Sequence, residues 1–143
     1  MAKSTKVVGI AEFLEDVCRD AGRELGRRFV TGQKRKIFYK SDRSICTDAD
    51  LASEKIILGK IQKHFKNDLI LSEEAGRLGG GFKKGNIVWV IDPLDGTTNF
   101  ANGYQFFGVS VARCIVNERG SLTTLNGGIM YPAAKKFYYA GKG

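Results

Sequence analysis

The sequence has no long apolar run and little of what a targeting segment needs. No stretch reaches the ~18 consecutive apolar residues from which a transmembrane helix is recognised. Near the N-terminus, a short apolar run is soon followed by Glu12, Glu15 and Asp16, a pattern too polar for a secretory signal. We therefore expect no membrane span and no membrane partner.

Cysteine and histidine are also scarce. Cys18, Cys46 and Cys114 are odd in number, widely spaced and without a C-x-x-C pair, which favours reduced thiols in a cytoplasmic protein. His64 is the only histidine, so a structural zinc site is not expected. No G-x-x-x-x-G-K-[ST] phosphate loop occurs, and the glycine-rich segment 76–85 is expected to be a mobile connection.

Length and charge indicate one domain with a basic surface. A chain of 143 residues that is 43% hydrophobic can bury an ordinary core. The formal net charge of +8 comes from short, scattered runs such as Arg27-Arg28 and Lys83-Lys84. These runs are not interleaved with aromatic residues as in an RNA-binding platform. We therefore expect a surface that attracts anionic substrates, and no nucleic-acid partner.

Two helices are expected before the main strands. Apolar residues recur at every fourth position in the first of them, which predicts an amphipathic helix from about Ile10 to Gly32. A second helix is expected to begin at Thr47 or Asp48, because either side chain can cap it. Charged residues of this second helix, Glu54 among them, are expected to face solvent.

The remaining sequence predicts strands separated by turns. The expected strands cover residues 69–71, 87–91, 106–116, 121–130 and 136–140. Short turns near residues 117–120 and 131–133 separate the last three, which indicates an antiparallel meander. Helices first and strands afterwards predict an α+β fold with two helices packed on one face of an antiparallel sheet.

The most informative segment follows the strand that begins at Ile87. It reads I-D-P-L-D-G-T-T-N-F, so a buried strand delivers Asp92 and Asp95 into a tight loop that opens at Gly96 into a helical turn. Carboxylates hold hard cations such as Mg²⁺. Backbone N–H groups at a glycine followed by a helical turn hold phosphate. The alternative is an acidic turn without chemistry, capped by Asp and Thr.

Two further acidic groups favour the chemical interpretation. Glu73-Glu74 ends another apolar run, and Asp50 lies at the start of the second helix. If neighbouring elements bring these ends together, the carboxylates crowd into one cleft and require protons or metal ions to offset their charge. Two Mg²⁺ ions are the natural counter-ions, and paired metals about 3.5–4 Å apart are common in phosphate hydrolysis.

These segments resemble the inositol monophosphatase family of metal-dependent phosphatases. D-P-L-D-G-T-T-N-F, starting at Asp92, is similar to the family signature. S-E-E-A-G, starting at Ser72, resembles the acidic motif that ends in glycine, and T-D-A-D, starting at Thr47, resembles the T-x-x-D helix start. The three occur in the family's order. The resemblance implies a layered α/β/α/β/α sandwich of which this chain supplies the N-terminal part.

The resemblance also implies a ligand set for magnesium. It assigns Glu73 and Asp92 to a first Mg²⁺, together with the backbone carbonyl of Leu94. Asp92 then bridges to a second metal that Asp95 also holds, and Asp95 is further expected to contact the substrate. Mg²⁺ prefers oxygen ligands and retains several waters, one of which serves as the nucleophile.

Catalytic and phosphate-binding roles follow from the same resemblance. Thr97 is expected to orient the attacking water, with Asp50 hydrogen-bonded behind it and Glu73 as a proton acceptor. The N–H groups of Gly96 and Thr97 are expected to hold phosphate oxygens. Asp50 has an alternative role as an ordinary first-turn helix acid that stabilises the helix dipole.

Some neighbouring residues allow two interpretations. Lys40 and Asp42 lie in K-S-D-R-S, which resembles the family's K-x-D-x-S segment, and they either line the site or belong to an ordinary loop. Cys46 is expected to be a small buried residue, because nothing in its neighbourhood clearly lowers its pKa.

One departure from the family is expected to matter for activity. Family members continue well beyond this length and carry a W-D-x-A-A-G-like motif that supplies a further metal ligand, whereas Trp89 is the only tryptophan here. Residues 1–143 are thus expected to form the N-terminal metal- and phosphate-binding half, with the C-terminal half absent. The full-length enzyme is expected to be a homo-oligomer.

Two functions therefore remain open from the sequence. The first is a Mg²⁺-dependent phosphomonoesterase for a small phosphorylated polyol, with inositol monophosphate as the leading substrate. Fructose bisphosphate, histidinol phosphate and a nucleotide bisphosphate are the alternative substrates. The second is a catalytically incomplete fragment or assembly partner of such an enzyme.

Overall fold

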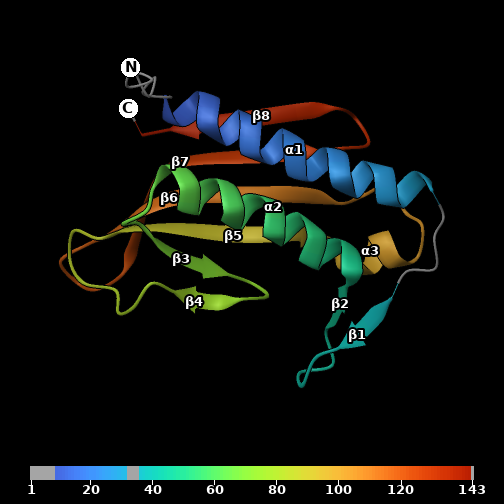
Figure 1. Ribbon diagram of the computed structural model, residues 1–143, viewed down its shortest axis with the longest axis horizontal. Helices are drawn as coiled ribbons and strands as arrows, with labels where there is room; N and C mark the ends of the chain where they lie inside the picture. Colours follow the sequence, from blue (N-terminus) through green and yellow to red (C-terminus); the bar gives the residue numbers. More distant parts are fainter. Residues whose placement is uncertain (1–8, 32–35, 143) are drawn as a thin grey trace, which may run out of the picture.

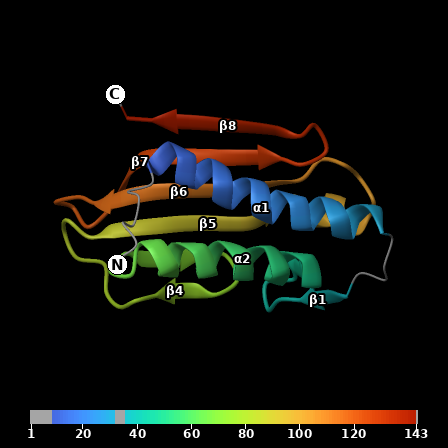
Figure 2. The same ribbon diagram turned by 45° about the horizontal axis from the view of Figure 1, so that its top comes forward.

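A computed structural model describes residues 9–31 and 36–142 of the chain. Two long helices, α1 (Ile10–Val30) and α2 (Asp48–His64), lie side by side on one face of a six-stranded sheet (Figures 1 and 2). The sheet has the order β4-β3-β5-β6-β7-β8. These two layers confirm an α+β fold with helices on one face. None of the helices described is long and apolar enough to cross a membrane.

The strands of the sheet follow the prediction closely at its centre. They are β3 (Leu69–Ser72), β4 (Gly76–Leu78), β5 (Ile87–Asp95), β6 (Gly108–Val116), β7 (Leu122–Tyr131) and β8 (Lys136–Gly141). The last three form the antiparallel meander that the turn residues predicted. Strand β4 was not predicted, so the segment 76–85 is only partly a connection.

The sheet is mixed, and the prediction of an antiparallel sheet was wrong at one pairing. Strands β3 and β5 run parallel, with Leu69 beside Val88 and Ser72 beside Ile91. Strand β4 runs antiparallel to β3 and brings the chain back to the end of the sheet where β3 begins. Residues 79–86 then lead to the other side of β3, so β5 runs in the same direction as β3. This parallel pairing places the C-terminal ends of both strands at one edge.

The core lies between the helices and the sheet. The apolar stripe of α1 is buried as its four-residue spacing predicted, with Phe13, Leu14 and Val17 at most 2% exposed. Phe13 packs edge-on against Trp89 of β5, at 5.4 Å between ring centroids. Burial of this stripe fixes α1 on the sheet, because apolar area removed from water is the main stabilising term. Helix α1 ends at Val30, and the predicted end at Gly32 lies outside the described residues.

Helix α2 begins where its capping residues predicted. Thr47 is the N-cap, and its hydroxyl accepts a hydrogen bond from the amide of Ala49 at 3.2 Å. The carboxylate of Asp50 accepts a hydrogen bond from the amide of Thr47 at 2.8 Å, which completes a capping box. The start of α2 is therefore held by contacts between side chains that are close together in the sequence.

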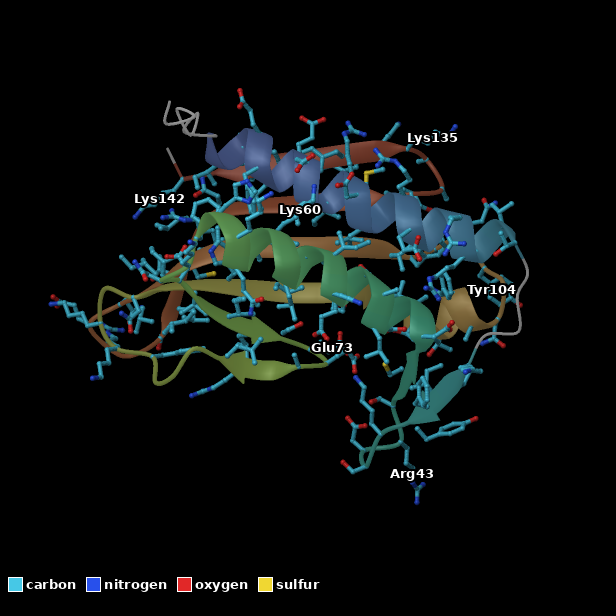
Figure 3. All side chains as sticks on the ribbon, viewed as in Figure 1. Arg43, Lys60, Glu73, Tyr104, Lys135 and Lys142 are labelled. Atoms are coloured by element: carbon cyan, nitrogen blue, oxygen red, sulfur yellow. The ribbon has the colours of Figure 1, made fainter. Side chains whose placement is uncertain are left out.

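Three short elements lie next to the acidic loop. Strands β1 (Ile37–Tyr39) and β2 (Ile45–Thr47) pair as an antiparallel hairpin, whose tip at Arg43 projects from the body of the molecule (Figure 3). Helix α3 (Thr97–Ala101) is the single helical turn expected after Gly96. The hairpin leads directly into α2, so it is tied to the element that carries Asp50.

Candidate metal and phosphate site

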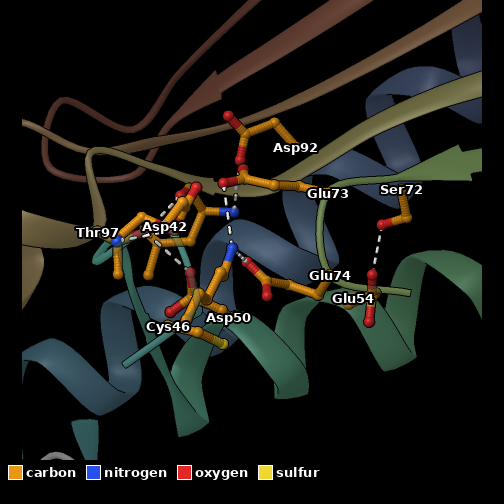
Figure 4. Close-up of polar contacts among 12 residues, drawn as sticks. Asp42, Cys46, Asp50, Glu54, Ser72, Glu73, Glu74, Asp92 and Thr97 are labelled. Atoms are coloured by element: carbon orange, nitrogen blue, oxygen red, sulfur yellow. Dashed lines mark hydrogen bonds and ion pairs between the residues drawn. The ribbon is translucent and has the colours of Figure 1, made fainter. Parts of the chain in front are cut away.

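The site forms at the edge where β3 and β5 end. The amide of Glu73 donates to the carbonyl of Ile91 at 3.1 Å, so Glu73 lies beside the start of the acidic loop. Figure 4 shows the side chains of Glu73 and Asp92 next to one another. The parallel pairing produces this contact, because an antiparallel neighbour would have placed its C-terminal end at the opposite edge.

The loop after Asp92 is held in a fixed shape. A carboxylate oxygen of Asp92 accepts from the amide of Leu94 at 3.2 Å, and the buried hydroxyl of Ser53 donates to the carbonyl of Pro93 at 2.6 Å. Gly96 has φ +84° and begins α3. A Cβ at Gly96 would lie 2.6 Å from the carbonyl oxygen of Phe106, so only glycine fits both the conformation and the space.

A single open cavity of about 350 Å³ joins most of the predicted site. Its lining includes the predicted metal-binding and phosphate-binding residues Glu73, Asp92, Leu94, Asp95, Gly96 and Thr97. Asp50 is not part of this lining and lies behind Thr97. The geometry therefore brings together residues from two strand ends and one helix start.

Asp50 and Thr97 are linked across 47 positions of sequence. The hydroxyl oxygen of Thr97 lies 2.9 Å from a carboxylate oxygen of Asp50 and 3.0 Å from the carbonyl oxygen of Leu94. The other oxygen of Asp50 accepts from the amide and hydroxyl of Thr47. Asp50 is thus both a helix cap and a hydrogen-bond partner of Thr97, and its catalytic role stays a prediction.

Burial gives the carboxyl of Asp50 an unusual environment. Asp50 is only 1% exposed. Burial raises the pKa of Asp50, although hydrogen bonds from Thr47 and Thr97 oppose that shift. The hydroxyl of Thr97 has one proton and two neighbouring acceptors, which orients its lone pairs relative to the cavity.

The electrostatics of Asp92 point to a cation at this edge. Burial, a hydrogen bond with Glu73, and the charges of Glu73 and Asp95 raise the pKa of Asp92 to about 7. These carboxyls repel one another because oxygen atoms of like charge share one cavity. A divalent cation offsets such repulsion, and the oxygen donors present here are those that Mg²⁺ prefers.

The raised pKa of Asp92 predicts how the stability of the metal-free chain depends on pH. The folded chain holds the Asp92 proton more tightly than the unfolded chain, whose carboxyl has the ordinary value of 3.8. Its contribution to stability is therefore complete below about pH 4 and is lost as the pH rises through about 7. Urea unfolding in chelator should show the native chain losing stability between about pH 4 and pH 7 relative to Asp92→Asn. A difference between the two chains that is constant with pH would contradict this.

Lys40 of the hairpin also reaches the acidic edge. Its ammonium lies 2.7 Å from a carboxylate oxygen of Glu74 and 3.5 Å from one of Glu73. Burial opposes its charge, but the ion pairs with Glu74 and Glu73 raise the pKa of Lys40. Lys40 therefore contacts the acidic residues beside the cavity but is not part of its lining. Asp42 accepts from the amide and hydroxyl of Ser44 and shapes the turn of the hairpin.

A second acidic group lies deeper than the cavity. Possible ligand atoms of Cys46, Asp50 and Glu74 lie within 4.8 Å of one another. Both oxygens of Asp50 already accept hydrogen bonds, and Glu74 is paired with Lys40. Burial, followed by the charges of Asp50 and Glu74, raises the pKa of Cys46 to about 12, so its thiol stays protonated at neutral pH. The ligand atoms of this group are thus hydrogen-bonded, ion-paired or protonated already.

Glu54 corrects the sequence prediction for α2. It was expected to face solvent, but it is 7% exposed and accepts from the hydroxyl of Ser72 and, at 2.9 Å, from the amide of Ala75. These two contacts hold the chain on both sides of Glu73. The spacing of Asp50, Ser53 and Glu54 on one helix face was the signal available in the sequence.

The inositol monophosphatase family model matches residues 7–143. The chain belongs to the inositol monophosphatase family. This family comprises metal-dependent phosphatases that use Mg²⁺. Membership explains why the acidic edge, the glycine turn and the helix start occur together in one chain.

Three similar proteins place the chain within this family. The phosphatase IMPL1 of Arabidopsis thaliana, named as chloroplastic, is 43% identical over 112 residues, which is 77% of this chain and 29% of that protein. The Nus factor SuhB of Pasteurella multocida is 40% identical over 94 residues, covering 66% of this chain and 34% of SuhB. The crystal structure of the extragenic suppressor protein suhB from Bartonella henselae has a TM-score of 0.80 at 29% identity, and the match covers 94% of this chain and 49% of that one.

The structural match covers the N-terminal part of the family fold. The matched region spans about half of the Bartonella chain and about a third of the curated relatives.

The expected small phosphorylated substrate, cytoplasmic location and homo-oligomer stay predictions, as do the expectations of no nucleic-acid and no membrane partner.

Proposed function

We propose that this chain is the N-terminal metal- and phosphate-binding half of a Mg²⁺-dependent phosphomonoesterase. The observation that carries the proposal is the cavity in which Asp92, flanked by Glu73 and Asp95, adjoins the turn at Gly96. Carboxylates for a cation and backbone amides for a phosphate thus lie in one opening.

The residues present fit the family's magnesium. Glu73, Asp92, Asp95 and the carbonyl of Leu94 would hold it, and the Leu94 carbonyl keeps a second lone pair besides the one that accepts from Thr97. When bound, Mg²⁺ supplies positive charge that offsets the carboxylates and lowers the pKa of a bound water. Lys40, 3.5 Å from Oε1 of Glu73, would then compete with the metal for that oxygen.

The chain's own groups supply the remaining roles. The hydroxyl of Thr97, directed by Asp50 and the Leu94 carbonyl, would orient a water in the cavity. Glu73, whose side chain is 47% exposed, would accept a proton from that water. The amides of Gly96 and Thr97 would hold phosphate oxygens at the first turn of α3.

A small phosphorylated polyol fits these requirements best, and inositol monophosphate is the leading substrate. The cavity of about 350 Å³ is at the small end of ligand sites and is open to solvent, so a polar ligand of this size enters without closing the site. Fructose bisphosphate, histidinol phosphate and a nucleotide bisphosphate are the alternative substrates.

A second candidate function is favoured because the chain matches only part of the length of its relatives. A chain that matches 49% of the Bartonella henselae protein would be a catalytically incomplete fragment or an assembly partner. Inositol monophosphate hydrolysis by the isolated chain, compared with the chain supplied with a family C-terminal half, separates the two. Activity that appears only in the combined sample supports the fragment, and ordinary activity of the chain alone supports a self-sufficient enzyme.

Metal binding tests the proposed site directly. Calorimetry should show Mg²⁺ or Mn²⁺ binding to the native chain and a loss of at least about tenfold in affinity for Asp92→Asn, since even indirect supports of a metal site are commonly worth 10–100-fold. Asp16→Asn is the matched control, because Asp16 lies on α1 and pairs with Lys60. Equal titrations for the native chain and Asp92→Asn would refute the site.

A further inference from the structure

A cavity larger than the one at Asp92 lies away from the acidic edge. It measures about 510 Å³ and opens between α1 and the turn that joins β7 to β8, a turn that Figure 3 marks at Lys135. It shares no lining residue with the cavity at Asp92. Its size is within the usual range of small-ligand sites, about 300–1,000 Å³.

Two features of the helix and the sheet create this space. Gly26 on α1 has nothing within 4 Å of where a Cβ would stand, so the helix leaves a gap there. The floor and walls are apolar, formed chiefly by Phe29, Phe107, Met130 and Pro132. Phe29 and Phe107 pack together at 5.1 Å between ring centroids, which gives the floor a rigid aromatic surface.

The charged groups around the cavity have one sign. Arg19, Arg23 and Lys135 line it, and no acidic residue does. Arg19 is paired with Glu15 and Arg23 with Asp20, both outside the lining. Lys135 has φ +55° at the turn and is exposed, and no ion pair of Lys135 occurs within residues 9–31 and 36–142. The cavity thus combines an apolar floor with a cationic rim.

We propose that this cavity binds a small amphiphilic anion, with its apolar body on the aromatic floor and its carboxylate at Lys135, the lining cation that has no ion pair within residues 9–31 and 36–142. An apolar body gains by leaving water for the floor. The ammonium of Lys135 attracts the carboxylate. A neutral or cationic head group has no such attraction to the rim. This site is independent of the proposed phosphatase chemistry, because none of its residues belongs to the acidic edge.

The test uses decanoate below its micelle concentration, added to the full chain and followed by calorimetry. Decanoate should bind with one site per chain, and decanol and decyltrimethylammonium should bind more weakly. Gly26→Leu fills the gap on α1 and should weaken decanoate binding at least about tenfold. Its matched control is Gly59→Leu on α2, where a Cβ also meets nothing within 4 Å and which lines neither this cavity nor the one at Asp92.

A second variant removes charge without filling the cavity. Lys135→Asn keeps a residue that tolerates positive φ and should weaken decanoate binding about three- to fivefold, as for an exposed ion pair. Lys142→Asn is its control and should bind as the native chain does. Unchanged decanoate binding in both Gly26→Leu and Lys135→Asn, or equal affinity for decanol, would overturn the proposal. If Gly26→Leu does not fold, Lys135→Asn and the decanol comparison decide.

Discussion

Thr97→Ala is expected to lower turnover about 10²–10⁴-fold in an enzyme completed with a family C-terminal half, the range typical of a positioned group that acts on a proton. The hydroxyl of Thr97 lies between Asp50 and the Leu94 carbonyl and would direct the attacking water. Thr97 contributes no carboxylate to the metal, so affinity for Mg²⁺ should remain close to that of the native enzyme. Turnover at saturating Mg²⁺ and calorimetric metal affinity measure the two quantities separately.

Thr98→Ala is the matched control for this experiment. Thr98 is the next residue of α3 and also lines the cavity, but its side chain is exposed and its hydroxyl makes no hydrogen bond within residues 9–31 and 36–142. Its contribution to α3 is through its carbonyl, which accepts from Asn102. The control should retain near-native turnover. If Thr97→Ala also retains it, Thr97 is only a helix-start residue, and the water-orienting role is wrong. A loss of metal affinity equal to the loss of turnover would instead make Thr97 a support of the ligand loop.

Gly96→Ala is expected to destabilise the fold by about 2–4 kcal/mol, because about 1–2 kcal/mol of left-handed backbone strain adds to a packing clash. The clash is with backbone, since a Cβ at Gly96 would lie 2.6 Å from the carbonyl oxygen of Phe106. That carbonyl also accepts from the side chain of Asn99 at 2.8 Å, so it cannot move away without loss. Urea unfolding at one pH, with chelator present, measures the change.

Gly103→Ala separates the two contributions. Gly103 has φ +80°, close to the value of Gly96, but nothing lies within 4 Å of its Cβ position. Gly103→Ala should therefore cost only the backbone strain, about 1–2 kcal/mol. Equal destabilisation by Gly96→Ala and Gly103→Ala would show that the close approach of Phe106 has no energetic weight. The difference in unfolding free energy between the two variants measures the cost of the clash with the Phe106 carbonyl.

Local patterns predicted the parts of the site that neighbouring residues make. The turn from Asp92 to Gly96, the helix start at Thr47 and the buried stripe of α1 are all formed where the sequence predicted them. Each depends on contacts within a few positions, such as the capping box of Thr47 and Asp50. The spacing of residues along the chain is enough to specify such contacts.

The family resemblance predicted which residues form the site, and the direction of the strands decided which of these residues lie together. The antiparallel sheet expected from the strand order would have kept Glu73 away from Asp92. The parallel pairing of β3 and β5 brings them together, and it arises because the chain returns through β4 before residues 79–86 lead it to the start of β5. No periodicity within either strand encodes the direction of its neighbour.

The sequence alone determined the helices, the meander, the acidic loop and the family. Only the tertiary structure decided that Glu54 is buried against Ser72, that Lys40 pairs with Glu74, and that a basic-rimmed cavity opens over Phe107. These are contacts between residues far apart in sequence, and their free energy depends on the whole path of the chain. A charged residue such as Glu54 has the same local pattern whether it faces water or the hydrogen-bond donors of Ser72 and Ala75, so packing determines its role.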